Sequence, residues 1–219
     1  GMLVMIACSD PSDAMVAPFG ARTAVFTPDP IAVGIPTGGD PILIDMSASI
    51  TTAGMSAHLR REGRSYPGAW AVDAGGRATD DPNVLKADPP GALLPAGGLD
   101  HGQKGYGLAL MVEALTQGLS GHGRADGETE WGASVFVQAF NPALFGGAEA
   151  FTRQTGFIAD LVHAAAPIDP NQPVRLPGEA ALGRLREAET TGVALDPKIL
   201  AGLAEAMGRY SVAAPTPAG

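Results

Sequence analysis

The stretch that decides the fold reads GGLDHGQKGYGLALMVEAL at residues 97–115. Its first half is dense in glycine, carries Lys104 and is expected to form a flexible loop. Its second half predicts a helix over residues 106–119, because its apolar residues recur at the helical period. These residues are Leu108, Met111, Val112 and Leu115. A helix start suits a phosphate or a carboxylate, and Lys104 adds a full charge there. The same pattern also fits a loop whose glycines only turn the chain.

Apolar runs elsewhere predict strands first and helices later. Short runs rich in Val and Ile predict buried strands at residues 2–8, 31–35, 41–46 and 135–140. Longer amphipathic segments predict further helices at residues 49–62, 148–165 and 197–208. Asp196 before Pro197 is typical of a helix start. Residues 65–98 are rich in glycine, proline and aspartate and are expected to be irregular, which in a compact domain usually indicates a functional or elaborate surface loop.

Length and composition predict a packed enzyme domain. The chain has 219 residues, of which 45% are hydrophobic, enough to bury a sizeable core. It shows no internal repeat and no linker between independent domains. We therefore expect one domain over residues 1–210, followed by a frayed tail at residues 211–219.

The net charge of −9 and the absence of a basic cluster argue against nucleic acid as a partner. An acidic protein that takes anionic substrates must concentrate positive charge locally, which draws attention to Arg22, Lys104 and Arg175.

Several other classes of site are not supported by the sequence. The single cysteine, Cys8, excludes an intrachain disulfide and fits a reducing cytoplasm, where we expect the protein to be. The apolar run at residues 2–8 is too short to span a bilayer and lacks the basic start of a signal peptide. No group of side chains has metal-ligand spacing. No Gly-x-Gly-x-x-Gly follows a strand, so a Rossmann nucleotide site is not supported.

Five segments carry a family resemblance in chain order. They are Asp45-Met46-Ser47-Ala48-Ser49, Pro67-Gly68-Ala69-Trp70-Ala71-Val72-Asp73, Gly75-Gly76-Arg77-Ala78-Thr79-Asp80-Asp81-Pro82, Lys104-Gly105-Tyr106-Gly107-Leu108 and Pro177-Gly178-Glu179. Together they resemble the type-2 malate/L-lactate dehydrogenase family, which also contains ureidoglycolate, sulfolactate and cyclic-imine-acid enzymes. The resemblance extends from Met2 to about Met207.

The resemblance implies both a fold and an activity. The fold would be α/β, with three layers (α/β/α) and a mixed, largely antiparallel sheet unlike the Rossmann fold. The activity would be hydride transfer between NAD or NADP and a 2-hydroxy/2-oxo acid or a cyclic imine acid. The partners would be that small-molecule acid and a second copy in a homodimer. No residue distinguishes NAD from NADP.

The resemblance also assigns cofactor contacts to nine residues. They are Ser9, Asp45, Met46, Ser47, Lys104, Gly105, Pro177, Gly178 and Glu179. Two of them have a structural alternative. Lys104 fits either an anion contact or a solvated surface lysine. Asp45 fits either a contact to the nicotinamide or ribose, or a cap for the next helix.

The proton-transfer group is not identified. The family carries its histidine in a Ser-His-Gly motif, and none of the four histidines here has that context. The chain therefore resembles the C-terminal part of a dehydrogenase and is expected to be inactive alone, since general acid–base help contributes about 10²–10⁴-fold. His101 is the candidate replacement, although a solvent-exposed loop histidine fits the same position. The alternative function is a truncated, inactive relative that binds a nucleotide or a partner protein.

A second departure from the family concerns Asp29. The family's Gly-Thr-Asn-Pro is replaced here by Phe26-Thr27-Pro28-Asp29-Pro30, so a carboxyl stands where the family has an amide. If that amide contacts an anionic group of the cofactor, a carboxylate at Asp29 would repel the group.

Overall fold

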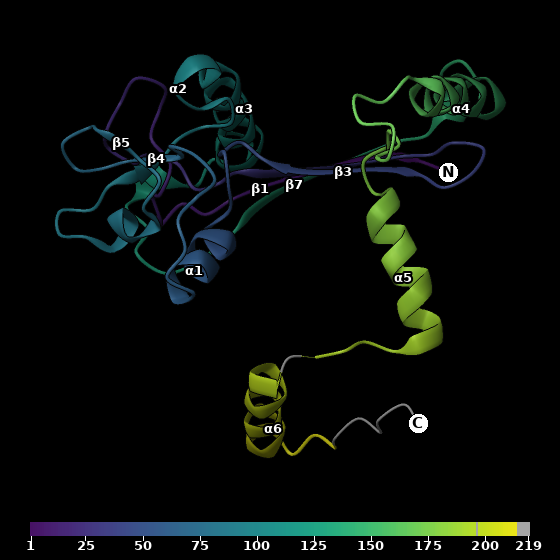
Figure 1. The fold of residues 1–219 in the computed structure, drawn as a ribbon. Helices are drawn as coiled ribbons and strands as arrows, with labels where there is room; N and C mark the ends of the chain where they lie inside the picture. Colours follow the sequence, from purple (N-terminus) through teal and green to yellow (C-terminus); the bar gives the residue numbers. More distant parts are fainter. Residues whose placement is uncertain (196, 214–219) are drawn as a thin grey trace. The chain divides into compact units, whose positions relative to one another are not determined.

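The computed structural model describes residues 1–195 and 197–213 (Figure 1). It consists of two compact units, Gly1–Pro177 and Gly178–Gly219. The single domain expected over residues 1–210 stays a prediction. Asp196, the expected helix start, lies outside the described residues, as do residues 214–219 of the expected tail.

The first unit is organised around a four-stranded sheet. Its strands are β1 (Leu3–Ser9), β2 (Pro30–Ile35), β3 (Ile42–Ser47) and β7 (Ser134–Phe140). Their order is β3-β2-β1-β7, and all neighbours are antiparallel. The four predicted strands are confirmed to within one residue at each end, because continuous Val- and Ile-rich runs are typical of buried strands.

The two faces of this sheet differ in burial. On one face, Ala7 and Ile31 pack against Val112 of α3 (Gln103–Glu113). The opposite face carries apolar side chains that remain accessible, since neighbours along a strand point to opposite faces. They are Ile6, Leu43, Val135 and Val137, with exposed fractions of 41, 37, 57 and 62%. We call this set the open sheet face.

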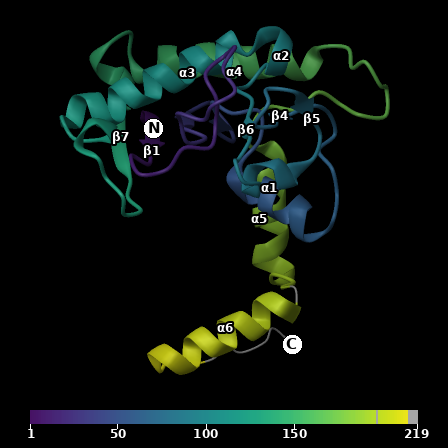
Figure 2. The same ribbon diagram turned by 90° about the vertical axis from the view of Figure 1, so that its left-hand side faces the viewer.

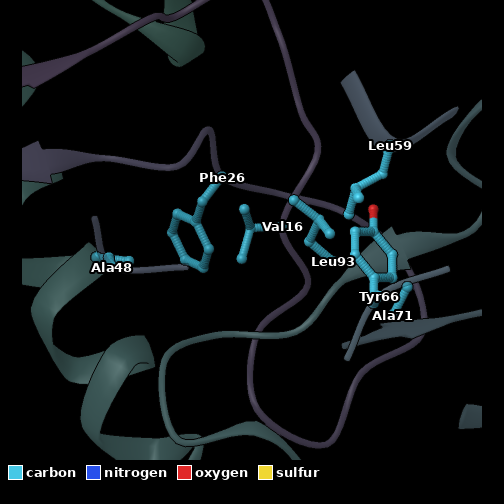
Figure 3. Packing of buried hydrophobic residues seen from close by; sticks show 8 residues of the cluster. Val16, Phe26, Ala48, Leu59, Tyr66, Ala71 and Leu93 are labelled. Atoms are coloured by element: carbon cyan, nitrogen blue, oxygen red, sulfur yellow. The ribbon is translucent and has the colours of Figure 1, made fainter. Parts of the chain in front are cut away.

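Most of the stretch expected to be irregular is loop, and a second, smaller sheet lies within it. This sheet consists of β4 (Ala71–Val72), β5 (Ala78–Thr79) and β6 (Ala92–Leu93), in the order β5-β4-β6. The 3₁₀ helix Pro82–Lys86 and helix α1 (Ala53–Arg61) pack beside it. The main core lies here, and Figure 3 shows Leu93 between Val16 and Tyr66.

The predicted α/β class is confirmed. In both views, α3 and α4 (Ala148–Ala164) lie above the strands and α1 lies below them (Figures 1 and 2). Within the described residues every ladder is antiparallel, and parallel pairing is limited to the isolated bridge between Val16 and Leu93.

The expectation of a flexible loop before Lys104 is wrong. Residues Gly98–His101 form the short helix α2, and α3 begins at Gln103, so Lys104 lies inside the first helical turn. Gly97 and Gly98 have φ of 98° and 62°, which glycine adopts without strain, whereas Gly102 is needed for close packing. A Cβ at Gly102 would collide with Gly98 O and with the ring of Phe19. The helix then continues as a π turn over Ala114–Gly118.

Helix α1 starts later than predicted. The predicted range of residues 49–62 shortens to Ala53–Arg61, because Thr52 caps the helix by accepting from Met55 N at 3.1 Å. By contrast, the prediction of a helix at residues 148–165 is confirmed by α4.

The second unit contains α5 (Glu179–Thr191) and α6 (Pro197–Tyr210). Helix α6 confirms the predicted last helix. Helix α5 was not predicted, because few apolar residues mark its face. In the described part of the chain, no helix has the length and apolar character needed to cross a membrane.

Candidate functional site

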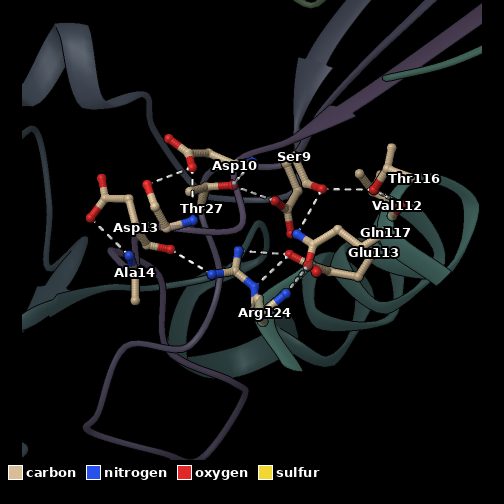
Figure 4. A network of polar contacts seen from close by, with 12 residues as sticks. Ser9, Asp10, Asp13, Ala14, Thr27, Val112, Glu113, Thr116, Gln117 and Arg124 are labelled. Carbon is tan, nitrogen blue, oxygen red and sulfur yellow. Dashed lines mark hydrogen bonds and ion pairs between the residues drawn. The ribbon is translucent and has the colours of Figure 1, made fainter. Parts of the chain in front are cut away.

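The end of β1 carries a buried polar network (Figure 4). Ser9 is buried, and its hydroxyl lies 2.7 Å from Thr116 Oγ1 and accepts from Gln117 Nε2 at 3.0 Å. Thr116 donates to Val112 O at 2.7 Å, which leaves the Ser9 hydroxyl as the donor to Thr116. The hydroxyl of Ser9 therefore holds β1 against the end of the α3 segment.

Arg124 extends this network toward the surface. Its Nη2 and Nε lie 2.7 and 3.0 Å from Glu113 Oε1, and its Nη1 donates to Asp13 O at 2.6 Å. Its backbone N donates to Gln117 Oε1 at 2.8 Å. The guanidinium thus connects the helix to the loop after β1, with both charged side chains largely buried.

Asp29 is the most unusual residue next to this network. It is fully buried, its Oδ1 accepts from Thr27 Oγ1 at 2.6 Å, and its Oδ2 has no partner among the described residues. Its φ of 47° is uncommon for a residue other than glycine. Burial, helped by the charge of Glu113, raises the pKa of Asp29 to about 7, against the lowering effects of the Thr27 hydrogen bond and of Arg124. A neutral, protonated carboxyl is therefore abundant at and below neutral pH.

Cys8 faces the same acidic surroundings. Burial, followed by the charges of Asp29 and Asp10, raises the pKa of the Cys8 thiol. A raised thiol pKa disfavours the reactive thiolate.

Hydrogen bonds link this region to the serine-rich segment after β3. Asp10 N donates to Thr27 Oγ1 at 3.4 Å, and Thr27 donates in turn to Asp29. Ala48 N donates to Asp29 O at 3.3 Å and to Pro28 O at 2.8 Å. The ends of β1 and β3, which carry Ser9 and Ser47, are therefore joined through Thr27 and Asp29.

Ala48 also meets the start of α3. Gly105 is buried, and a Cβ at this position would collide with Ala48 O and with Ala96 N. Gly105 N donates to Ala96 O at 3.0 Å, and Ala96 N donates to Ala48 O at 2.7 Å. Glycine at 105 thus lets α3 approach two backbone segments, and the neighbouring Lys104 side chain is exposed.

The side chains at the end of β3 are accessible. Asp45 and Met46 are exposed, and Ser47 Oγ donates to Ser49 O at 3.1 Å. Thr52, not Asp45, caps α1, so the capping alternative for Asp45 is wrong. Its cofactor contact remains a prediction.

The predicted C-terminal turn is Pro177-Gly178-Glu179. Pro177 is the last residue of the first unit, and Gly178 is the first residue of the second. Pro177 O accepts from Leu43 N of β3 at 2.9 Å, which places Pro177 two residues along the strand from the position of Asp45. Gly178 has a φ of 95° and precedes α5, whose first residue is Glu179. The structure therefore joins the end of β1 to the end of β3, and the end of β3 to the start of α3, with Pro177 beside β3.

The four histidines are all exposed, and His122 lines a pocket beside Glu113, Gln117 and Arg124 of the network. His101 is the last residue of α2, while His58 lies 3.4 Å from Glu62 and His122 lies 3.1 Å from Glu128. Among the described residues, no three His, Cys, Asp or Glu side chains are arranged to hold a metal ion.

The network itself was missed by sequence reasoning. Ser9 and Thr116 are 107 positions apart, so no local spacing predicts their contact. The sequence singled out only Ser9, through the family resemblance, and Asp29, as a carboxyl in place of the family's amide.

Comparisons with known proteins identify the family of this chain. The family model for malate/L-lactate dehydrogenase matches residues 1–204. The chain is 30% identical over 209 residues to an L-lactate dehydrogenase of Cupriavidus necator, covering 92% of this chain and 58% of the relative. It is 32% identical over 203 residues to a Delta(1)-pyrroline-2-carboxylate/Delta(1)-piperideine-2-carboxylate reductase of Pseudomonas putida, covering 88% and 55%.

A solved structure supports the same assignment. A dehydrogenase from Sinorhizobium meliloti superimposes with a TM-score of 0.76 at 31% identity, covering 94% of this chain and 59% of that one. The chain thus spans less than two thirds of the length of these relatives. On the family match and these likenesses, the chain belongs to the malate/L-lactate dehydrogenase family.

Proposed function

We propose that this chain is part of an NAD(P)-dependent oxidoreductase of the malate/L-lactate dehydrogenase type. Its substrate would be a 2-hydroxy/2-oxo acid or a cyclic imine acid. The observation that carries the proposal is the family match over residues 1–204. The nicotinamide cofactor supplies the hydride chemistry when bound, and the protein binds and orients the reactants.

The chemistry of the residues around Ala48 and Gly105 fits such a cofactor. Lys104, next to Gly105 in the sequence, offers an exposed ammonium group, and Ser47, next to Ala48, offers a half-buried hydroxyl. The ammonium group is a donor suited to phosphate or carboxylate oxygens, whereas the Ser47 hydroxyl would exchange its hydrogen bond to Ser49 O for such a contact. In this proposal Lys104 binds an anionic group directly. Ser9, whose hydroxyl is engaged with Thr116, holds the strand end in position.

Binding of NADH and NADPH tests the proposal. Lys104→Ala is expected to weaken binding about 10–100-fold, because a hydrogen bond to a charged group contributes about 1.5–3 kcal/mol and 1.4 kcal/mol corresponds to tenfold. Fluorescence titration at two ionic strengths measures this, and raising the salt should weaken the wild type more than the variant. Arg61→Ala, which removes an exposed cation from α1, is the matched control. Equal affinities of the wild type and Lys104→Ala would assign Lys104 to the solvated surface.

Binding without turnover is the second candidate. The observation that favours it is the exposure of all four histidine side chains. NADH oxidation with pyruvate, oxaloacetate and cyclic imine acids distinguishes the two candidates. A turnover number near the typical ~10 s⁻¹ of enzymes would exclude the non-catalytic candidate and direct attention to His101.

We also propose a homodimer in a reducing compartment such as the cytoplasm. The dimer is supported by the open sheet face, because apolar surface of this kind is commonly buried against a partner. The compartment is supported by the single cysteine. Sedimentation showing only monomer at micromolar concentration would contradict the dimer.

A further inference from the structure

A cleft of about 580 Å³ lies beside the small sheet, and none of the predicted cofactor contacts lines it. Its walls come from residues 13–15, 22–24, 74, 85–86 and 89–91. Sites for small molecules usually have volumes of about 300–1,000 Å³. The cleft is therefore large enough for a small organic or inorganic ligand.

The walls of this cleft are fixed by backbone packing. Gly91 lies so close to β4 that a Cβ would collide with Val72 O, and Gly91 N donates to Val84 O at 2.8 Å. Met15 O accepts from Leu93 N at 2.9 Å. Two prolines, Pro89 and Pro90, restrict the chain just before Gly91. A ligand would thus enter a preformed site and order little of the chain.

Arg22 lies at one wall of the cleft, and among the described residues one of its guanidinium N–H groups donates a hydrogen bond. Its Nη1 donates to Ala74 O at 3.2 Å. A Cβ added to Gly76 would lie 3.5 and 3.7 Å from Arg22 Cβ and Cδ, so the stem of the side chain runs along this turn. A guanidinium has five N–H donors in a planar fork, which leaves four for a ligand.

Lys86 supplies a second cation from the end of the 3₁₀ helix. In the described part of the chain, neither Arg22 nor Lys86 forms an ion pair with a carboxylate. The acidic residue in the lining is Asp13, whose Oδ1 accepts from Ala14 N at 2.8 Å. Two unpaired cations therefore share one cleft in a chain of net charge −9.

We propose that this cleft is an anion site that binds a small molecule through its phosphate or carboxylate groups. The planar fork of Arg22 matches two oxygens of such a group, and the ammonium of Lys86 neutralises its remaining charge. The site is separate from the proposed cofactor site at Ala48 and Gly105, and its existence does not depend on dehydrogenase activity.

Nuclear magnetic resonance titration tests this proposal at low ionic strength. Inorganic phosphate and malonate serve as probes, and potassium chloride controls for ionic strength. Saturable shifts are expected for the amides of residues 13–15, 22–24, 85–88 and 91, since Pro89 and Pro90 have no N–H. Arg22→Ala and Lys86→Ala should each weaken the affinity for the probe about tenfold, while Lys86→Arg should keep most of it. Arg61→Ala, which removes an exposed cation elsewhere, should bind as the wild type does.

Each outcome decides the question. Tighter binding of phosphate than of malonate supports a phosphate ligand, and the reverse order supports a dicarboxylate. Equal affinities of the wild type, Arg22→Ala and Lys86→Ala would overturn the site, as would no saturable shift with either probe. If NADH competes with phosphate for the same amides, the cleft belongs to the cofactor site and the proposal of a separate site fails. Loss of NADH binding in Lys104→Ala alone would leave the proposal standing.

Discussion

Replacing Asp29 with asparagine should make the protein more stable at high pH, by an amount that grows as the pH rises. Burial raises the pKa of this carboxyl from 3.8 to about 7. The folded state therefore keeps a proton that the unfolded state releases, so the stability of the wild type falls as the pH rises from about 4 to about 7. A shift of about 3 pKa units at about 1.4 kcal/mol per unit gives a loss of about 4 kcal/mol. The amide of the Asp29→Asn variant has no such proton to lose, so this part of the pH dependence should disappear.

The substitution is well matched to the site. Asparagine has nearly the same shape, tolerates a φ of 47° better than most residues, and can still accept from Thr27. Its amide NH₂ would replace the unpartnered Oδ2, a cost that does not vary with pH. Glu113 and Arg124, the other charged groups acting on Asp29, are unchanged.

Urea unfolding at pH 5, 6, 7 and 8 measures the effect. The free energy of unfolding of Asp29→Asn, relative to the wild type, should rise by about 3 kcal/mol across this range, because part of the loss in the wild type already occurs below pH 5. Asp160→Asn, which changes an exposed carboxyl on α4, is the control and should follow the wild type. Parallel pH profiles for Asp29→Asn and the wild type would refute the argument that Asp29 is buried and neutral.

Two further substitutions test the packing around the candidate site. Gly105→Ala should cost about 3 kcal/mol, because its Cβ would meet the backbone of Ala48 and Ala96, whereas Gly107→Ala on the same helix meets open space and should stabilise by about 0.5–1 kcal/mol. Denaturant unfolding of both variants measures this, and a cost for Gly107→Ala as large as that for Gly105→Ala would contradict it. Arg124→Met should cost about 3 kcal/mol by leaving Glu113 largely buried and unpaired, and the double variant with Glu113→Gln should cost less than the two single changes added. A double-mutant cycle checks the coupling, and simple additivity would show that the ion pair is not coupled.

The four-stranded sheet could be predicted because each of its strands is marked by its own run of residues. Runs such as residues 2–8 and 135–140 are continuous and rich in Val, Ile and Phe, so each strand is marked without reference to its neighbours. The small sheet was not predictable in this way. Each of its strands has two residues, which is too short for any hydrophobic period to appear.

Glycine misled the prediction at the start of α3. A glycine-rich segment predicts a flexible loop if conformational freedom is taken as the reason for its glycines. Gly102, however, has a φ of −61°, in the ordinary helical region, so left-handed freedom is not the reason for it. It is glycine because Gly98 O and the Phe19 ring occupy the space of a Cβ. Crowding of this kind depends on tertiary structure and leaves no mark on local sequence.

The candidate site shows the same division between local and long-range information. The five family segments located Ser47 and Lys104, but the contacts that join the segments of Ser9, Ser47 and Lys104 pass through residues outside these five, namely Thr27, Asp29 and Ala96. Among these, Asp29 is the point at which the chain departs from its family. An amide at that position would be neutral at every pH, whereas this carboxyl carries a charge that depends on pH near neutrality. The backbone carbonyl of Asp29 accepts from Ala48 N, and Ala48 packs against Gly105, so the titrating carboxyl lies next to the backbone that holds the Lys104 segment. The pH dependence of stability and any pH dependence of cofactor binding should therefore change together in Asp29→Asn.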